Sequence, residues 1–129
     1  MNLIALQAIF IRHERRNENC LIKQPDGSDQ YELLPVNYEI PCSFVEAHGV
    51  RFLCPKSFLE NSGPVGSHQV RVFFEGSPVP PDVGTNKAGK MVRWTKTGSG
   101  LIDLSLFPSI EEQDDICKWH GFVTNGDAT

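Results

Sequence analysis

The sequence predicts a mainly β fold, a small single-domain β sandwich or partial barrel with one or two short helical turns. Short apolar runs alternate with polar residues, and glycine, proline or asparagine separates one run from the next. The 129 residues match the commonest size of one domain and show no internal repeat, so we assign residues 1–129 to a single domain. An α+β arrangement is the alternative.

The first strands are expected in the N-terminal third of the chain. Residues 3–13 carry apolar side chains on both faces, which indicates a strand covered on two sides; a short buried helix is the alternative. Pro25-Asp-Gly27 predicts the turn of a hairpin, because proline fixes φ and glycine accepts a positive φ. A further strand is expected over residues 31–36, ending at Pro35.

The middle of the chain predicts one helical turn and two strands. Residues 43–48 fit a single helical turn with a serine at its start and a glycine after its end. Residues 50–54 indicate a buried strand, and residues 56–66 a loop or short helix. Residues 69–75 alternate most clearly, so they give the strongest strand prediction.

The last third predicts a loop followed by short strands. Residues 76–89 hold three prolines and three glycines, which indicates a long loop. Strands are expected at residues 91–95, 101–106 and 117–124, with a turn at 97–100, an acidic loop at 108–115 and a turn at Asn125-Gly126.

Composition and charge indicate which partners and which cellular locations the chain fits. Hydrophobic residues make up 40% of the chain, charged residues 22%, and the net charge is −4. Binding to phosphate backbones needs clustered Lys and Arg, and the one basic cluster, residues 12–16, is interrupted by His13 and Glu14, so nucleic acid is an unlikely partner. No run approaches the roughly 20 apolar residues of a membrane-spanning helix. The apolar N-terminus precedes its basic residues, unlike a signal peptide, which favours a cytoplasmic protein.

Cysteine and histidine residues form the most pointed chemical pattern. Cys117 and His120 are spaced C-x2-H, and Cys54-Pro-Lys-Ser57 resembles a C-x2-C knuckle whose second cysteine is serine. His68 begins the clearest strand and could bring a further ligand. Thiolate and imidazole together suit tetrahedral zinc, so the sequence predicts a zinc site at Cys54, His68, Cys117 and His120.

Three alternatives stay open for these residues. If His68 does not reach, three protein ligands would leave a fourth position to water, as catalytic zinc requires. Because free cysteine is often buried, Cys54 and Cys117 could instead belong to a metal-free core. A disulfide between Cys54 and Cys117 is the third alternative, although the absence of a secretory signal favours metal or plain burial.

The carboxylates and tryptophans are weaker candidates. An acidic run follows residue 110, and such a run is usually a solvated surface that binds at most a cation or a basic partner; its members are Glu111, Glu112, Asp114 and Asp115. Trp94 and Trp119 are expected in the core or at an interface rather than as stacking platforms. No nucleotide-binding or hydrolase motif is present, so catalysis is not the leading expectation.

Several longer segments resemble a family of small, uncharacterised proteins from tailed bacteriophages and prophages. The resemblance covers most of the chain, including the apolar opening strand that ends in Ile11-Arg-His-Glu14, and the segments that carry it best are Phe52–His68, Arg93–Ser105, Pro108–Ile110 and Trp119–Ala128. Some members bear an ammonia-monooxygenase label that nothing in this sequence supports. The family pattern runs C-P-K-C, a later histidine, then C-x-W-H-G-F, and it implies ligands at Cys54, His68, Cys117 and His120 but departs at Ser57.

The resemblance implies a phage or prophage origin and a location in the host cytoplasm, but no reaction. The first hypothesis is a non-enzymatic accessory protein, stabilised by zinc, that binds a host or phage protein and could counter a host defence. One alternative is a small metal-dependent hydrolase or nucleotide-binding protein with an open zinc, whose base would be Glu14, Asp103 or Asp127. Another is a virion-assembly component. An exposed strand edge also makes a dimer possible.

Overall fold

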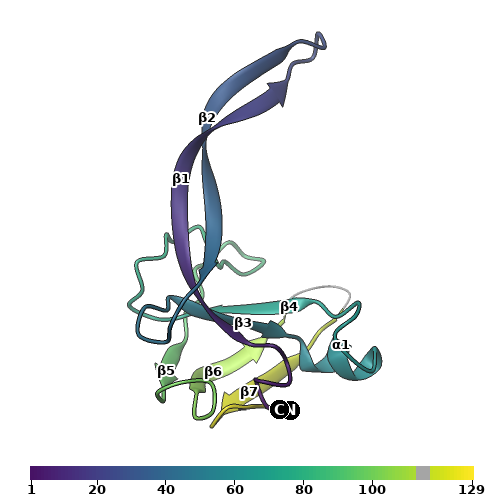
Figure 1. Cartoon of the computed structure of the whole chain (residues 1–129), viewed down its shortest axis with the longest axis vertical. Helices are drawn as coiled ribbons and strands as arrows, with labels where there is room; N and C mark the ends of the chain where they lie inside the picture. The colour runs from purple at the N-terminus through teal and green to yellow at the C-terminus, as the bar shows by residue number, and fades with distance from the viewer. Residues whose placement is uncertain (113–116) are drawn as a thin grey trace.

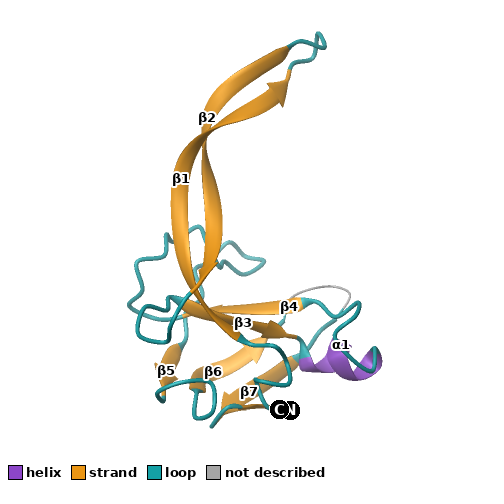
Figure 2. Ribbon diagram, in the orientation of Figure 1, coloured by secondary structure: helices purple, strands orange, loops and turns teal. Residues whose placement is uncertain are grey.

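Two four-stranded antiparallel sheets and one short helix make up the computed structural model, which describes residues 1–112 and 117–129 (Figure 2). The first sheet has the order β2-β1-β3-β4, with strands β1 (Ile9–Lys23), β2 (Asp29–Pro41), β3 (Gly49–Leu53) and β4 (Gln69–Phe73). The second has the order β5-β6-β7-β8, with strands β5 (Thr95–Thr97), β6 (Ser105–Glu111), β7 (His120–Thr124) and β8 (Asp127–Ala128). The helix is α1 (Pro55–Glu60). The mainly β prediction is confirmed.

A long hairpin dominates the shape of the molecule. β1 and β2 pair over thirteen positions, but only Ile9–Ile11 of β1 also pairs with β3. The rest of the hairpin therefore rises alone from the two sheets, as Figure 1 shows. We call the segment Glu14–Tyr38 the arm and the remainder of the described chain the body.

The arm closes at the turn that the sequence predicts. Gly27 has φ +86°, and Asp26 accepts hydrogen bonds from the main-chain N–H and the hydroxyl of Ser28. The predicted end of the second strand at Pro35 is wrong, because β2 continues to Pro41. β2 is an edge strand, and an edge strand tolerates a proline whose nitrogen faces away from its neighbour.

Charged side chains fix the base of the arm to the body. Glu39, the body residue that follows the arm, accepts hydrogen bonds from Arg51, at 2.8 Å, and from Arg71, at 2.6 Å. In the arm, Nη2 of Arg15 donates to both carboxylate oxygens of Asp82 in the 76–89 loop, at 2.9 and 3.0 Å. These contacts set the direction in which the arm leaves the body.

The core lies between the two sheets of the body. Its fully buried side chains come from the N-terminal segment and from both sheets, and include Leu3, Leu6, Val50, Phe52, Val72, Phe74, Leu104 and Val123. Phe52 of β3 meets Trp119, the residue before β7, edge to face, with ring centroids 6.0 Å apart. The predicted placement of Trp94 and Trp119 in the core is confirmed.

The N-terminal and middle segments differ locally from the prediction. Residues 3–7 form turns that bury Leu3 and Leu6, so the first strand begins only at Ile9. Residues 43–48 form turns with i to i+3 bonds rather than a helical turn. The helix lies in the segment expected to be a loop or a short helix.

The later strands are also shifted along the chain. Asp103 accepts hydrogen bonds from the main-chain N–H groups of Ser99 and Gly100, which folds residues 99–103 into a turn and delays β6 to Ser105. Part of the expected acidic loop consequently belongs to β6. No helix within the described residues is long and apolar enough to cross a membrane.

Candidate metal centre

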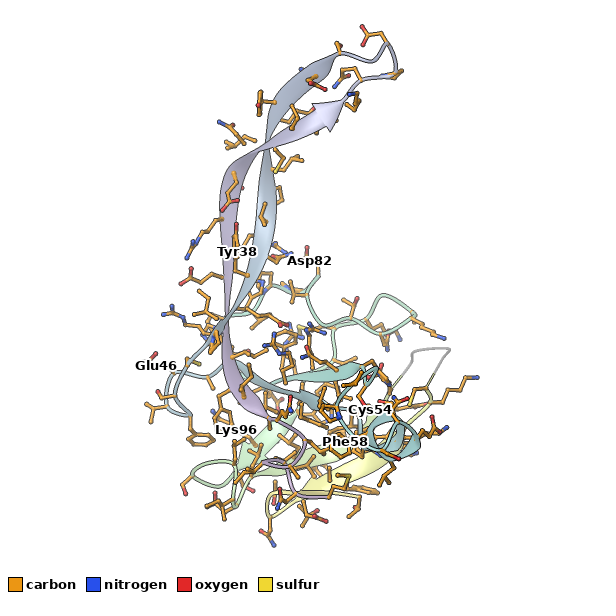
Figure 3. The ribbon with its side chains drawn as sticks, turned by 45° about the vertical axis from the view of Figure 1, so that its right-hand side comes forward. Tyr38, Glu46, Cys54, Phe58, Asp82 and Lys96 are labelled. Atoms are coloured by element: carbon orange, nitrogen blue, oxygen red, sulfur yellow. The ribbon has the colours of Figure 1, made fainter. Side chains whose placement is uncertain are left out.

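The pairing of β3 with β4 places Cys54 beside His68. The two strands pair Leu53 with Gln69, and the next step of the ladder is a hydrogen bond from the Cys54 N–H to the His68 carbonyl, at 2.9 Å. Residues directly opposite in an antiparallel pair have their side chains on the same face. Fourteen residues of separation thus become a cross-strand contact at the end of the first sheet, next to α1, where Figure 3 labels Cys54.

The segment before β7 supplies Cys117. Trp119 packs on Phe52, and Cys117 lies two residues before Trp119 just as Cys54 lies two residues after Phe52. Cys117 and Trp119 are both buried, whereas Lys118 between them is exposed, which is the alternation of an extended chain. The sulfur atoms of Cys54 and Cys117 lie 3.3 Å apart.

Three ligand atoms converge at this position. The sulfur atoms of Cys54 and Cys117 and a ring nitrogen of His68 all lie within 4.8 Å of one another, so the cluster could hold a metal ion. Both thiols are free and buried, with residue exposures of 0% and 3%. The disulfide that was the third alternative for these two cysteines is therefore not formed. Sulfur atoms bound to a tetrahedral zinc are about 3.8 Å apart, so the observed 3.3 Å would have to widen by only a few tenths of an ångström.

His68 offers the most direct sign that the cluster lacks a partner. Its Nε2 atom is buried and has no hydrogen-bond partner among the described residues. A buried polar atom without a partner typically costs about 1–3 kcal/mol. A metal ion bound at this imidazole would remove that cost.

The Cys117 thiol is protonated in the metal-free protein at neutral pH. Burial, together with the hydrogen bond to Cys54, raises the pKa of Cys117 to about 11. Only a thiolate binds zinc strongly, so metal binding must displace the proton and becomes weaker as the pH falls.

Ser57 lies in the first turn of α1, three residues after Cys54, at the place of the second cysteine in a C-x2-C knuckle. It is buried, and its hydroxyl donates to the Cys54 carbonyl at 3.3 Å. A neutral hydroxyl that is already committed to a main-chain acceptor is a weak fourth ligand. The described residues thus provide three strong ligands rather than four.

His120, the fourth predicted ligand, does not join the cluster. It is exposed at the start of β7, where its Nε2 lies 3.0 Å from the Ser109 hydroxyl and its ring stacks on Phe122. Three residues separate His120 from Cys117, and in an extended chain an odd separation puts two side chains on opposite faces. The C-x2-H spacing would converge in a helix or a tight knuckle, but not in this strand.

The carboxylates considered as catalytic bases are occupied elsewhere. Glu14 pairs with Arg12 and Arg16, and Asp103 closes the turn at residues 99–103. Asp127 lies 3.3 Å from the N-terminal amine of Met1. In the acidic run, Glu111 and Glu112 are described, whereas Asp114 and Asp115 lie outside the described residues.

A cavity of about 420 Å³ lies between β4, the loop at residues 84–92 and the end of β6. Its polar lining includes Arg71, Glu111 and Glu112, but none of the three cluster residues lines it. The cluster and this cavity are therefore separate features.

The sequence did not single out the apolar residues of the arm. Leu21, Tyr31 and Leu33 are 56%, 69% and 66% exposed. The sequence does carry a signal for this exposed surface. Apolar residues stand at both even and odd positions on either side of the hairpin turn, and such a pattern indicates a ribbon with no fixed inner face.

No protein-family model matches this chain, and no match was found among curated proteins or solved structures. The resemblance to phage proteins therefore stays a prediction.

Proposed function

We propose that this protein is a non-enzymatic bacteriophage accessory protein that acts in the host cytoplasm. Zinc at Cys54, His68 and Cys117 stabilises the body, and the arm binds a host or phage protein. The single observation that carries the proposal is the buried cluster of two thiols and an unpartnered imidazole. The phage origin, the cellular location and a role against host defence follow only from the sequence resemblance.

Zinc is the metal that best suits this ligand set. Two sulfur ligands with one nitrogen ligand favour zinc over magnesium or calcium, which prefer oxygen. The ligands come from the residue after β3, from the residue before β4 and from the segment before β7, so one ion would link the ends of both sheets. Such a crosslink stabilises the folded body, because the unfolded chain has no preformed site.

A structural role fits the surroundings of the cluster better than a catalytic one. Catalytic zinc keeps a position open to substrate, and both thiols here are buried away from the cavity next to β4. One observation favours the alternative of a metal-dependent hydrolase, namely that only three strong ligands are present. Three strong ligands also fit a structural site, because a buried water or the weakly binding Ser57 hydroxyl would fill the fourth position.

The arm supports a binding role. Monomeric proteins seldom expose contiguous apolar surface without a partner, and Leu21, Tyr31 and Leu33 share one face of the hairpin. The arm carries three basic and five acidic residues. An acidic ribbon is a poor match for a phosphate backbone, which favours a protein partner over nucleic acid.

Metal analysis of the purified protein tests the zinc centre. We expect about one zinc per chain in the wild type and in His120→Ala, and almost none in Cys117→Ser. Ser57→Cys should slow the removal of zinc by a chelator, because a thiolate would replace a weak ligand. Zinc at less than half an equivalent in the wild type, or its loss on His120→Ala, would contradict the proposed ligand set.

Affinity capture from host lysate, with and without phage infection, tests the arm. Leu33→Ser should weaken capture of the partner, whereas Val45→Ser, at a body position that is 91% exposed, should not. Equal capture by both variants would rule out the arm face as the binding surface. Detection of the protein in purified virions would instead support the virion-assembly alternative.

A further inference from the structure

The upper part of β1 has an unpaired edge. Odd-numbered residues of β1 direct their main-chain groups away from β2, because Ile11 accepts from His48 N–H at 2.8 Å and His13 N–H donates to Nδ1 of His48 at 3.0 Å. Beyond His13, no strand of the described chain pairs with this side of β1. Arg15 is engaged with Asp82, so the unpaired edge runs over residues 17–23.

The outer edge of β2 is protected in a way that this edge of β1 is not. Pro35 and Pro41 pair with Asn17 and Ile11, at positions whose main-chain nitrogen faces away from β1. Proline has no N–H, and proline on an edge strand discourages a further strand from adding there. The edge of β1 from residue 17 to 23 has no proline, so each outward position keeps its donor and acceptor.

The arm also lacks the support that a two-stranded ribbon normally needs. An isolated hairpin is at best marginally stable in water, and three or more strands are usually needed for independent stability. Leu21, Tyr31 and Leu33 are exposed on one face, while Ile22 and Leu34 are half-buried on the other. Additional strands beside β1 would widen the ribbon and place neighbours next to Leu21 and Ile22.

We propose that two copies of this chain pair through the β1 edges of their arms, antiparallel, over residues 17–23 of each copy. The result is a four-stranded sheet with the order β2-β1-β1-β2 across a twofold axis. Full overlap places residue 17 opposite residue 23 of the second copy, and therefore Cys20 opposite Cys20. The pairing of identical surfaces is the usual way in which dimers form.

Charge favours this register and a second copy as the occupant. The paired segment has one acidic residue, Glu18, and one basic residue, Lys23, so two copies do not repel each other there. A shift of one step towards the body would place Arg15 opposite Lys23, and a second step would place Glu18 opposite Glu18. Like charges directly opposite one another destabilise a sheet, and a shift towards the tip shortens the overlap.

Cys20 provides a reporter of the register. Outward-facing odd residues form the hydrogen-bonded pairs between the two copies, so the two Cys20 residues form a non-hydrogen-bonded pair with Cα atoms about 4.5 Å apart. A disulfide spans Cα separations of about 4.4–6.8 Å. A mild added oxidant such as copper-phenanthroline should therefore link two chains through Cys20, each thiol losing its proton and one electron to the oxidant.

Sedimentation of the zinc-loaded full chain between about 1 and 100 µM tests the pairing. We expect a species of twice the 14.4 kDa chain mass, and an oxidised crosslink that peptide mapping assigns to Cys20. Cys20→Ser should abolish the crosslink but keep the dimer. A monomer throughout this range, or a crosslink confined to another cysteine, would overturn the proposal.

Two proline variants separate edge pairing from general damage to the arm. Asn19→Pro removes a donor from the β1 edge and should abolish the dimer, whereas Leu33→Pro changes an outward position of the protected β2 edge and should retain it. Zinc content, measured on both, reports whether the body is intact, so failure of the metal centre is distinguished from failure of the pairing. A dimer that survives Asn19→Pro contradicts the proposed edge.

Discussion

The body and the arm are built from the same kinds of residue but differ in what covers them. In the body, β3 and β4 face a second sheet, and Val50, Phe52 and Val72 are completely or almost completely buried. In the arm, Leu21, Tyr31 and Leu33 face solvent on a ribbon two strands wide. Alternation of side chains decides that a segment is a strand, but the presence of a second layer decides whether its apolar face becomes a core.

Loss of a metal ligand should cause the largest decrease in the unfolding free energy of the body and should leave the arm unchanged. Cys117→Ser removes a thiolate from a buried site, and we expect the zinc-loaded protein to lose roughly 4 kcal/mol or more of unfolding free energy. Urea unfolding in the presence of zinc measures it. Cys20→Ser, in the arm, is the matched control, and an equal loss for both variants would remove the distinction between the two regions.

The next largest effect should come from truncating an apolar side chain, which should cost far more stability in the body than in the arm. Phe52→Ala leaves a cavity against Trp119 and should cost about 3–5 kcal/mol. Leu33→Ala removes an exposed side chain and should change stability by less than about 0.5 kcal/mol in the monomer. Thermal and urea unfolding of both variants provide the comparison. A cost above 2 kcal/mol for Leu33→Ala would show that the arm already has a covered face.

Much of this contrast could be predicted from the sequence, and the limits have physical causes. The strand expected over residues 69–75 and the turns at Gly27 and Asn125-Gly126 depend on local alternation and on positive φ. The structure contains both turns and a strand over Gln69–Phe73. The length of the arm could not be predicted, because Pro35 ends a central strand but not an edge strand.

The metal centre, too, could be predicted from the sequence only in part. Cys54, His68 and Cys117 were predicted as ligands from residue type, and the structure brings them together. The structure does not bring His120 into this cluster, because the C-x2-H spacing alone does not determine the backbone conformation. Cys117 lies before β7 and is buried, whereas His120 begins β7 and is exposed.

Low pH should reduce the stability that comes from the hydrogen bond between His48 and His13, near the base of the arm. Burial, followed by the positive charges of Arg12 and His13, lowers the pKa of His48, whose Nδ1 must be neutral to accept from His13 N–H. The unfolded chain then binds the proton more readily than the folded one. Stability from this group is complete above pH about 6.5 and is lost as the pH falls through the lower folded-state pKa.

The comparison of wild type with His48→Gln isolates this effect. Glutamine keeps a side-chain acceptor but does not titrate, so its urea midpoint should fall less than that of the wild type between pH 6.5 and 5. Parallel pH profiles for the two proteins would show that His48 does not contribute to this dependence.

Substitution of His120, at the exposed start of β7, should have the smallest effect on stability. His120→Ala removes a ring that contacts only Ser109 and Phe122 among the partners the structure shows, so stability should change by less than about 0.5 kcal/mol. Thermal unfolding with and without zinc measures it. A zinc-dependent loss of stability in this variant would indicate that His120 moves to the metal.

X-ray absorption at the zinc edge tests the central claim most directly, because it reports the atoms bound to the metal in solution. The account predicts two sulfur ligands at about 2.3 Å and two lighter ligands at about 2.0–2.1 Å, one of them the His68 imidazole. In Cys117→Ser one sulfur should disappear or the zinc should be lost. A first shell without sulfur, or a wild-type protein that retains no zinc, would contradict a body held together at Cys54, His68 and Cys117.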